Sequence, residues 1–298
     1  MRIATSTLSE NLVRQIQRLS TSQAKLQSQV ASGQRLTQPE DDPAAMGRVL
    51  NLNSEQRAMA QYARNANRAL ELSQASTSGL QQIKKLSDRA TEIGVLGAGA
   101  AAPEALQSYM SEVNQLIEQA VQLGNTRFGN DYLYAGTAVD APPFVAQRDA
   151  QGRVTSVAYA GNASQSAVAL SDTANITPGT SGTTNQGLAD FISHLVSLRD
   201  ALGAGDAAAV STAQTGLIGT EDVMVSGIAE QGAVQMRIEV NQSQQQDRLN
   251  DLQKLVSSEV DADLPTTIVH LNQASTAYQA ALQSSASIMH ISLLDYLK

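Results

Sequence analysis

Apolar residues recur at alternating spacings of three and four positions near both ends of the chain. The first series runs through Leu12, Ile16, Leu19, Gln23, Leu26 and Val30. The second runs through Ile268, Leu271, Ser275, Tyr278, Leu282, Ser285, Met289, Ser292 and Tyr296. This heptad repeat places an apolar stripe along a helix and predicts that the helix packs against another one. We therefore expect the terminal helices to pair with each other or with other copies.

The composition favours long helices over a broad globular core. Only 3% of the 298 residues are aromatic, and none is Trp, although 42% are hydrophobic. Large rings dominate burial in compact cores, whereas abundant Ala, Ser and Gln suit helices packed side by side. The predicted fold is mainly α, a long antiparallel helical rod whose N- and C-terminal helices pair as a coiled coil. Helical patterns cover 43–96, 103–125, 187–202 and 206–257, with a weak point at Gly216–Gly219 and Gly227.

Residues 136–186 depart from the helical pattern. They contain a proline pair, short alternation in VTSVAYAGN and the turn signal NITPG, which together predict short strands. We expect a small β-rich insertion domain here, at the far end from the termini. We predict an N-terminal coiled-coil helix over 1–42, which pairs with a C-terminal coiled-coil helix over 262–298. The helical rod domain is predicted over 43–135 and 187–261, and the insertion domain over 136–186.

The stretch SGQRLTQPEDDPAAMGRVL, residues 32–50, predicts a joint between two helices. Gly33 follows the first apolar series, where a helix commonly stops. Asp42 before Pro43 fits an acidic N-cap followed by proline at the first helical position, with Glu40 and Asp41 near the positive helix end. A metal site on the three acids is the alternative, but it would need further oxygen ligands that the neighbourhood does not offer. EVDADLP (259–265) predicts a second joint, at the same level as the first.

No pattern in the sequence predicts a catalytic, cofactor or metal site. The three histidines are scattered, the glycines of 94–99 lack the Lys of a phosphate loop, and no G-x-S-x-G motif occurs. We therefore expect no catalytic residue, no cofactor and no enzyme activity. The absence of cysteine excludes disulfides and thiolate ligands. A net charge of -8 argues against nucleic acid as a partner. The sequence contains no run of eighteen apolar residues, so it predicts no membrane span.

Three segments carry a family resemblance. LQSQVASGQRLTQPEDDPAAMGRVLNL resembles the N-terminal region shared by flagellins and hook-associated proteins. TRFGNDYLYAGT (126–137), followed by PPF, is similar to a motif of the hook-associated protein 3 group, and YQAALQSSASIMHISLLDYL (278–297) resembles the ending of that group. The departures are Ala281, where Ser is frequent, and Tyr134, where Phe is common. The resemblance covers both ends and one internal motif, and the 138–186 region only loosely.

The resemblance implies a structural protein of the bacterial flagellum at the junction of hook and filament. Proteins of this group leave the cell unfolded by type III export, which fits an N-terminus without a signal-peptide pattern. They form a ring above hook-associated protein 1, flagellin polymerises above them, and a cytoplasmic chaperone binds the C-terminal helix. The expected location is therefore the flagellum, after transient residence in the cytoplasm. A filament flagellin and a non-flagellar coiled-coil scaffold are the alternative predictions.

The residues that we expect at assembly contacts come from the two terminal series. The same residues are equally suited to pairing the two helices within one chain, since one apolar stripe can serve both uses. Residues 1–70 carry nine Lys or Arg and five Asp or Glu, whereas the rest of the chain is acidic, a bias that favours head-to-tail contact. The predicted contact residues are Leu12, Ile16, Leu19, Leu26, Val30, Leu271, Tyr278, Leu282, Met289, Leu293 and Leu294, and the predicted joint residues are Gly33, Asp41, Asp42 and Pro43.

Overall fold

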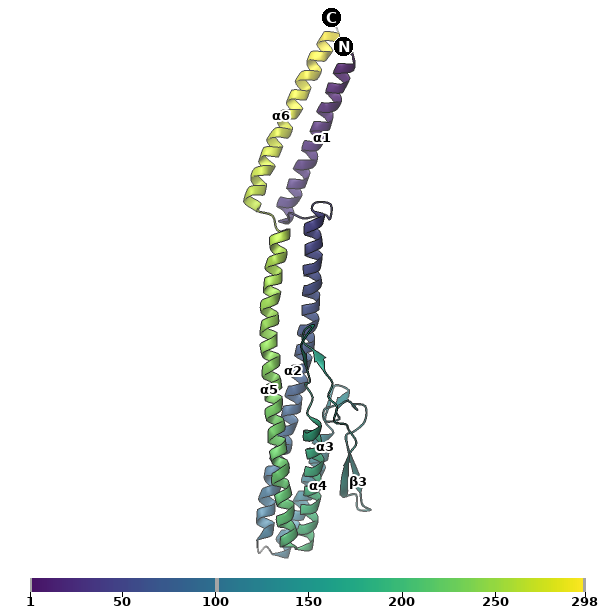
Figure 1. Ribbon diagram of the computed structural model, residues 1–298, viewed down its shortest axis with the longest axis vertical. Coiled ribbons are helices and arrows are strands. Elements are labelled where there is room, and N and C mark those ends of the chain that lie inside the picture. The colour runs from purple at the N-terminus through teal and green to yellow at the C-terminus, as the bar shows by residue number, and fades with distance from the viewer. Residues whose placement is uncertain (1, 100–101, 297–298) are drawn as a thin grey trace. The chain divides into compact units, whose positions relative to one another are not determined.

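The computed structural model describes residues 2–99 and 102–296, and it describes side chains for 10–99 and 102–287. The prediction of a mainly α fold with a small strand-containing region is confirmed (Figure 1). The helices of the described residues are α1 (Arg2–Ser32), α2 (Pro43–Ala98), α3 (Pro103–Gly124), α4 (Gly182–Ala204), α5 (Ala207–Val260) and α6 (Leu264–Tyr296). The chain divides into two compact units, Met1–Ala58 with Arg248–Lys298, and Met59–Asp247.

The first unit contains both ends of the chain. Helices α1 and α6 lie side by side and run in opposite directions (Figure 1). The start of α2 lies beside the end of α5, where Arg248 contacts Glu55 at 2.7 Å. Buried Leu36, Val49 and Leu252 fill the space around this second pair. The first unit thus consists of two helix pairs, and the α1–α6 pair is one of the two pairings that the heptad series predict.

The second unit holds the large core. Helices α3 and α4 pack together and against α2 and α5, and the buried side chains shared by these helices include Leu80, Ile93, Ile117, Leu195 and Leu198. These residues recur at helical spacing, so each helix contributes one apolar side. The composition therefore does support a core, but one made of aliphatic residues between long helices.

Helix α5 is continuous through the glycines where we expected a weak point, so that prediction is wrong. A Cβ at Gly216 would lie 2.4 Å from the His194 ring, and one at Gly227 would lie 2.7 Å from Thr184. Both neighbours belong to α4. The two glycines therefore allow α4 to approach α5 closely, and packing offsets their low helix propensity.

The strand-containing region has different bounds from the predicted 136–186. It runs from residue 127 to 176, and residues 182–186 already belong to α4. Its strands form three separate antiparallel hairpins and no larger sheet in the described part of the chain: β1 (Arg127–Phe128) with β2 (Asp131–Tyr132), β3 (Phe144–Arg148) with β4 (Val154–Tyr159), and β5 (Val168–Ala169) with β6 (Asn175–Ile176). Tyr134, Phe144 and Val154 are buried in the same core as the helices. The segment therefore shares the core of the second unit and has none of its own.

Candidate assembly site

The first helix joint is built from a left-handed glycine and an aspartate cap. Gly33 has φ of +71°, and its N–H donates to the carbonyl of Gln29 at 2.9 Å. Glycine adopts this conformation without the clash that a Cβ would cause, which is why α1 ends there. Asp42 Oδ1 accepts the N–H of Ala45 at 3.0 Å, and Pro43 is the first residue of α2. The joint thus has the C-cap and N-cap geometry that its sequence predicts.

Asp41 organises the loop that precedes α2. Its Oδ2 accepts the N–H groups of Thr37 and Gln38, each at 3.0 Å, and the Lys25 ammonium lies 2.7 Å from Oδ1. These contacts hold the pKa of Asp41 well below its usual range, and Lys25 has a larger effect than the two N–H groups. The carboxylate therefore has its partners without a metal ion. Within the described residues, no group of three or more His, Asp or Glu side chains could hold one.

The second joint is hydrogen-bonded to the first. The Arg35 N–H donates to the carbonyl of Val260 at 2.6 Å, and the Ala262 N–H donates to the carbonyl of Gly33 at 2.9 Å. The Arg48 guanidinium meets both carboxylate oxygens of Glu259, at 2.8 and 2.9 Å, and this contact lowers the pKa of Glu259. A two-pronged Arg–carboxylate pair fixes orientation as well as distance. The two breaks therefore lie at one level.

The predicted α1 residues share one side of that helix. Leu12, Ile16, Leu19, Leu26 and Val30 are all partly buried, whereas Val13 is 46% exposed. Since α6 is the helix beside α1, this side is the one used within the chain. The structure brings these five residues together along the α1–α6 contact, and their contact with other copies stays a prediction.

The α6 residues divide into two groups. Leu271 and Tyr278 are partly buried, and Thr267 and Ser285 are buried, with only 8% and 7% of their surface exposed. In contrast, Leu282 is 43% exposed. The buried side of α6 therefore combines two predicted positions with small hydroxyl residues, and Leu282 lies outside it.

Up to Ser285, the predicted α6 series follows the buried side of the helix except at Ile268 and Leu282. The buried or partly buried positions after the first turn are 267, 271, 274, 275, 278, 281 and 285, while Ile268 is 44% exposed. The predicted series includes Ser285 but takes Ile268 in place of Thr267. The hydroxyls of Thr267 and Ser285 donate to the carbonyls of Asp263 and Ala281, at 2.7 and 2.8 Å. Small residues whose hydroxyl groups are hydrogen-bonded permit two helices to approach closely. Small hydroxyl residues at helical spacing are therefore the sequence signal that could have located the buried side of α6.

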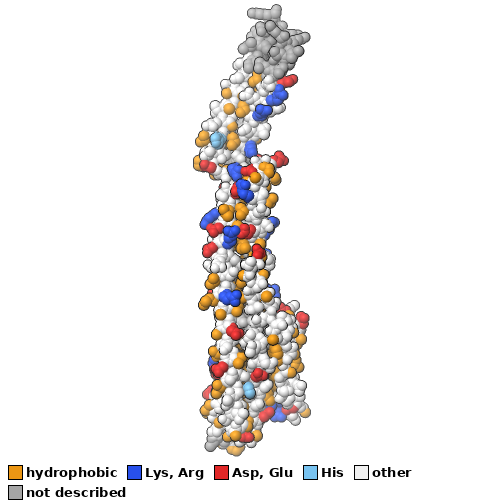
Figure 2. All heavy atoms as spheres, in the orientation of Figure 1, with side chains coloured by type: hydrophobic (Ala, Val, Ile, Leu, Met, Phe, Trp, Pro, Cys, Tyr) orange, Lys and Arg blue, Asp and Glu red, His pale blue; other side chains and the backbone are white. Residues whose placement is uncertain are grey.

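Ile268 and Leu282 form an outward apolar column on α6. They are fourteen positions apart, about four helical turns, so they lie on the same side of the helix. Figure 2 shows hydrophobic side chains reaching the surface over this helix. Met289, Leu293 and Leu294, also predicted contact residues, lie outside the residues whose side chains are described. No described helix is long and apolar enough to cross a membrane.

Comparison with known proteins agrees with these observations. The family model of the bacterial flagellin N-terminal helical region matches residues 3–139. Flagellar hook-associated protein 3 of Salmonella typhimurium is 30% identical over 146 residues, which are 48% of this chain and 46% of that protein. This match thus spans about half of that relative's length. Flagellar hook-associated protein 3 of Escherichia coli is 24% identical over 317 aligned positions, covering all of both chains.

A solved structure shares the fold. A putative flagellar hook-associated protein from Vibrio parahaemolyticus superimposes with a TM-score of 0.67 at 15% identity, over 74% of this chain and all of that one. By these matches the chain is similar to flagellin-like structural proteins of the flagellum. Both of the relatives aligned above by sequence carry the name flagellar hook-associated protein 3.

Proposed function

We propose that this chain is the structural subunit of the junction between the flagellar hook and the filament. It assembles into a ring through its terminal helices. The observation that carries the proposal is the α1–α6 pair, which leaves Val13, Ile268 and Leu282 between 43% and 46% exposed after the two helices have packed. Aliphatic residues in a column on one helix gain stability when another surface covers them.

The partners follow from the same arrangement. A ring needs contacts between two different surfaces of neighbouring copies, because a surface that contacts its own equivalent closes a dimer. The ring then offers one end to hook-associated protein 1 and the other end to flagellin. Before export, a cytoplasmic chaperone covers the C-terminal helix and keeps its apolar column from self-association. The role is structural, and no catalytic step belongs to it.

The experiment is complementation of a bacterial strain that lacks its own hook-associated protein 3. The chain should restore filaments on hooks, as counted by electron microscopy. Bare hooks with flagellin released to the medium would contradict the proposal. A second strain that lacks flagellin tests the alternative favoured by the N-terminal family match: long filaments made of this chain alone would identify it as a flagellin.

A pair of variants tests the apolar column. Leu282→Glu places a charge on an exposed site, so the monomer should keep its stability while assembly fails, because a buried unpaired carboxylate is costly. Gln279→Glu adds the same charge at another exposed position of α6 and should leave filaments unchanged. Normal filaments with Leu282→Glu would show that this column is not a contact between copies.

A further inference from the structure

Helix α5 carries an exposed apolar strip in the second unit. Ile218, Val225, Met236 and Val240 are 50%, 47%, 66% and 53% exposed. Their separations of seven, eleven and four residues are each close to a whole number of turns, so they lie along one side of the helix. Between Val225 and Met236 that side carries Ala229 and Gly232. Four large aliphatic side chains in a line exceed the scattered exposure of an ordinary surface.

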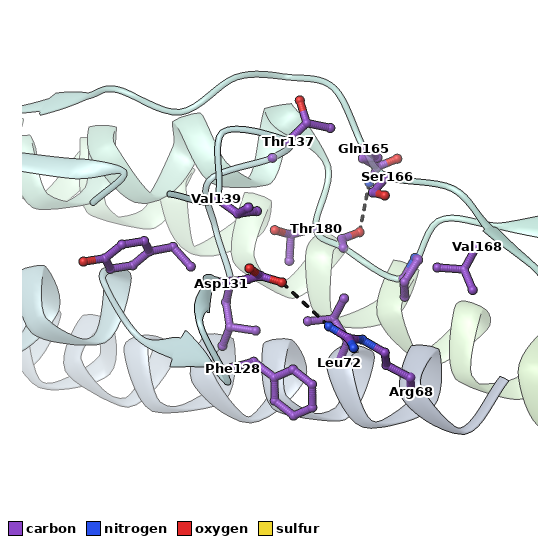
Figure 3. Close-up of a pocket in the computed structure, with 15 residues that line it drawn as sticks. Arg68, Leu72, Phe128, Asp131, Thr137, Val139, Gln165, Ser166, Val168 and Thr180 are labelled. Atoms are coloured by element: carbon purple, nitrogen blue, oxygen red, sulfur yellow. Dashed lines mark hydrogen bonds and ion pairs between the residues drawn. The ribbon is translucent and has the colours of Figure 1, made fainter. Parts of the chain in front are cut away.

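A cavity of about 270 Å³ lies elsewhere in the same unit. Its apolar lining includes Leu72, Phe128 and Val139, and Arg68 and Asp131 stand at its edge (Figure 3). Their ion pair is long, at 3.8 Å, and the Arg68 side chain is 76% exposed. The cavity is bounded by α2 and by the loops around β1, β2 and β5, and of the described residues that line it, none belongs to α5. Met236 and Val240 of the strip instead line a second, open hollow together with Leu170 and Ile176.

We propose that Met236 of one copy inserts into this cavity of a second copy. The inference rests on the proposed function, since it specifies how junction subunits contact one another. Met236 is the most exposed large hydrophobic residue of the described chain. A methionine side chain is unbranched and adapts to irregular apolar space. A knob on one surface and a cavity on another make a head-to-tail contact, which generates rings and not closed pairs.

The charges around the two surfaces are complementary. Glu239 is exposed beside Met236 on α5, and Arg64 and Arg68 are exposed one turn apart on α2. Arg237, the basic neighbour of Met236, is also exposed, and Asp131 at the cavity edge forms the long ion pair with Arg68. The knob and the cavity edge thus each carry both signs of charge, and the long, exposed Arg68–Asp131 pair is weak enough to exchange for contacts with Glu239 and Arg237. This favours a second copy over a partner of uniform charge.

Because the chain has no cysteine, crosslinking can test the contact without background. Two differently tagged versions, Met236→Cys and Ser166→Cys, would be produced together in the complemented strain and treated with a short bis-maleimide. Ser166 is exposed and lines the cavity. The mixed adduct should exceed by at least about tenfold the one formed when Ser111→Cys, an exposed serine on α3, replaces Ser166→Cys. Equal yields, or a predominance of Met236→Cys paired with itself, would overturn the inference.

A second measurement uses the cavity itself. Val139→Phe fills it and should lower the mixed adduct by at least about tenfold. Should Val139→Phe fail to fold by circular dichroism, Met236→Glu with Val240→Cys as the reporter replaces it, with the same expected loss. An unchanged adduct in the folded variant would overturn the inference. Filaments restored by the parent chain without the mixed adduct would leave the proposed function standing, whereas bare hooks would remove the proposed function itself.

Discussion

The contact between Tyr134 and Gly79 allows a quantitative test of the second unit. Tyr134 is fully buried, and its hydroxyl donates to the carbonyl of Ser76 in α2 at 3.0 Å. A Cβ at Gly79 would lie 2.1 Å from that hydroxyl oxygen and 3.2 Å from the ring carbon bearing it. Gly79→Ala therefore forces a buried ring to move, and the position of the hydroxyl decides how far.

The magnitude follows from two opposing terms. Alanine favours the helix over glycine by about 0.5–1 kcal/mol, and overpacking of a buried site costs about 1–3 kcal/mol. Gly79→Ala should thus destabilise the parent protein by about 1 kcal/mol net. In a Tyr134→Phe background, which itself loses one hydrogen bond worth about 1 kcal/mol, the closest atom is absent. There Gly79→Ala should be nearly neutral, so the coupling between the two changes is about 1–2 kcal/mol.

The assay is urea unfolding of the four proteins of this double-mutant cycle, followed by far-ultraviolet circular dichroism. Gly47→Ala is the matched control, because Gly47 is also in α2 but a Cβ there meets nothing within 4 Å. The control should gain about 0.5–1 kcal/mol. A coupling energy below about 0.3 kcal/mol between Gly79→Ala and Tyr134→Phe would refute the steric reasoning.

Three further changes test the joints and the core. Asp41→Asn should remove an acid-sensitive contribution to stability, because the Lys25 contact lowers the pKa of Asp41 from its ordinary 3.8. In the parent protein this contribution is full above that pH and fades as the pH falls below it. Unfolding measured at a series of pH values would show the difference. Gly33→Ala should lower the free energy of unfolding by about 1–2 kcal/mol, measured in urea. The added Cβ meets nothing within 4 Å, so the cost comes from the positive φ of residue 33 alone, and an unchanged free energy would contradict that reason. Arg199→Met should cost about 1–3 kcal/mol by the same assay, since the buried Arg199 donates to the carbonyl of Val154 at 2.5 Å, and an unchanged midpoint would show that this bond contributes nothing.

Local signals at the joints were sufficient for prediction. A glycine after an apolar series and an aspartate before a proline specify helix ends through backbone geometry that involves only a few neighbouring residues. The structure accordingly places Gly33 and Asp42 in the two capping geometries. The bounds of the strand-containing region were harder to predict, because each hairpin is short and its ends depend on the helices that it packs against.

The sequence by itself determined the helical class, the two breaks and the pairing of the chain ends, because heptad spacing and caps act within one or two turns. Only the tertiary structure decided that Thr267 is buried on α6 while Ile268 and Leu282 of the predicted series remain exposed. It also decided that Gly216 and Gly227 admit α4 and do not interrupt α5. Both outcomes depend on how closely two helices approach, a distance set by side chains far apart in the sequence.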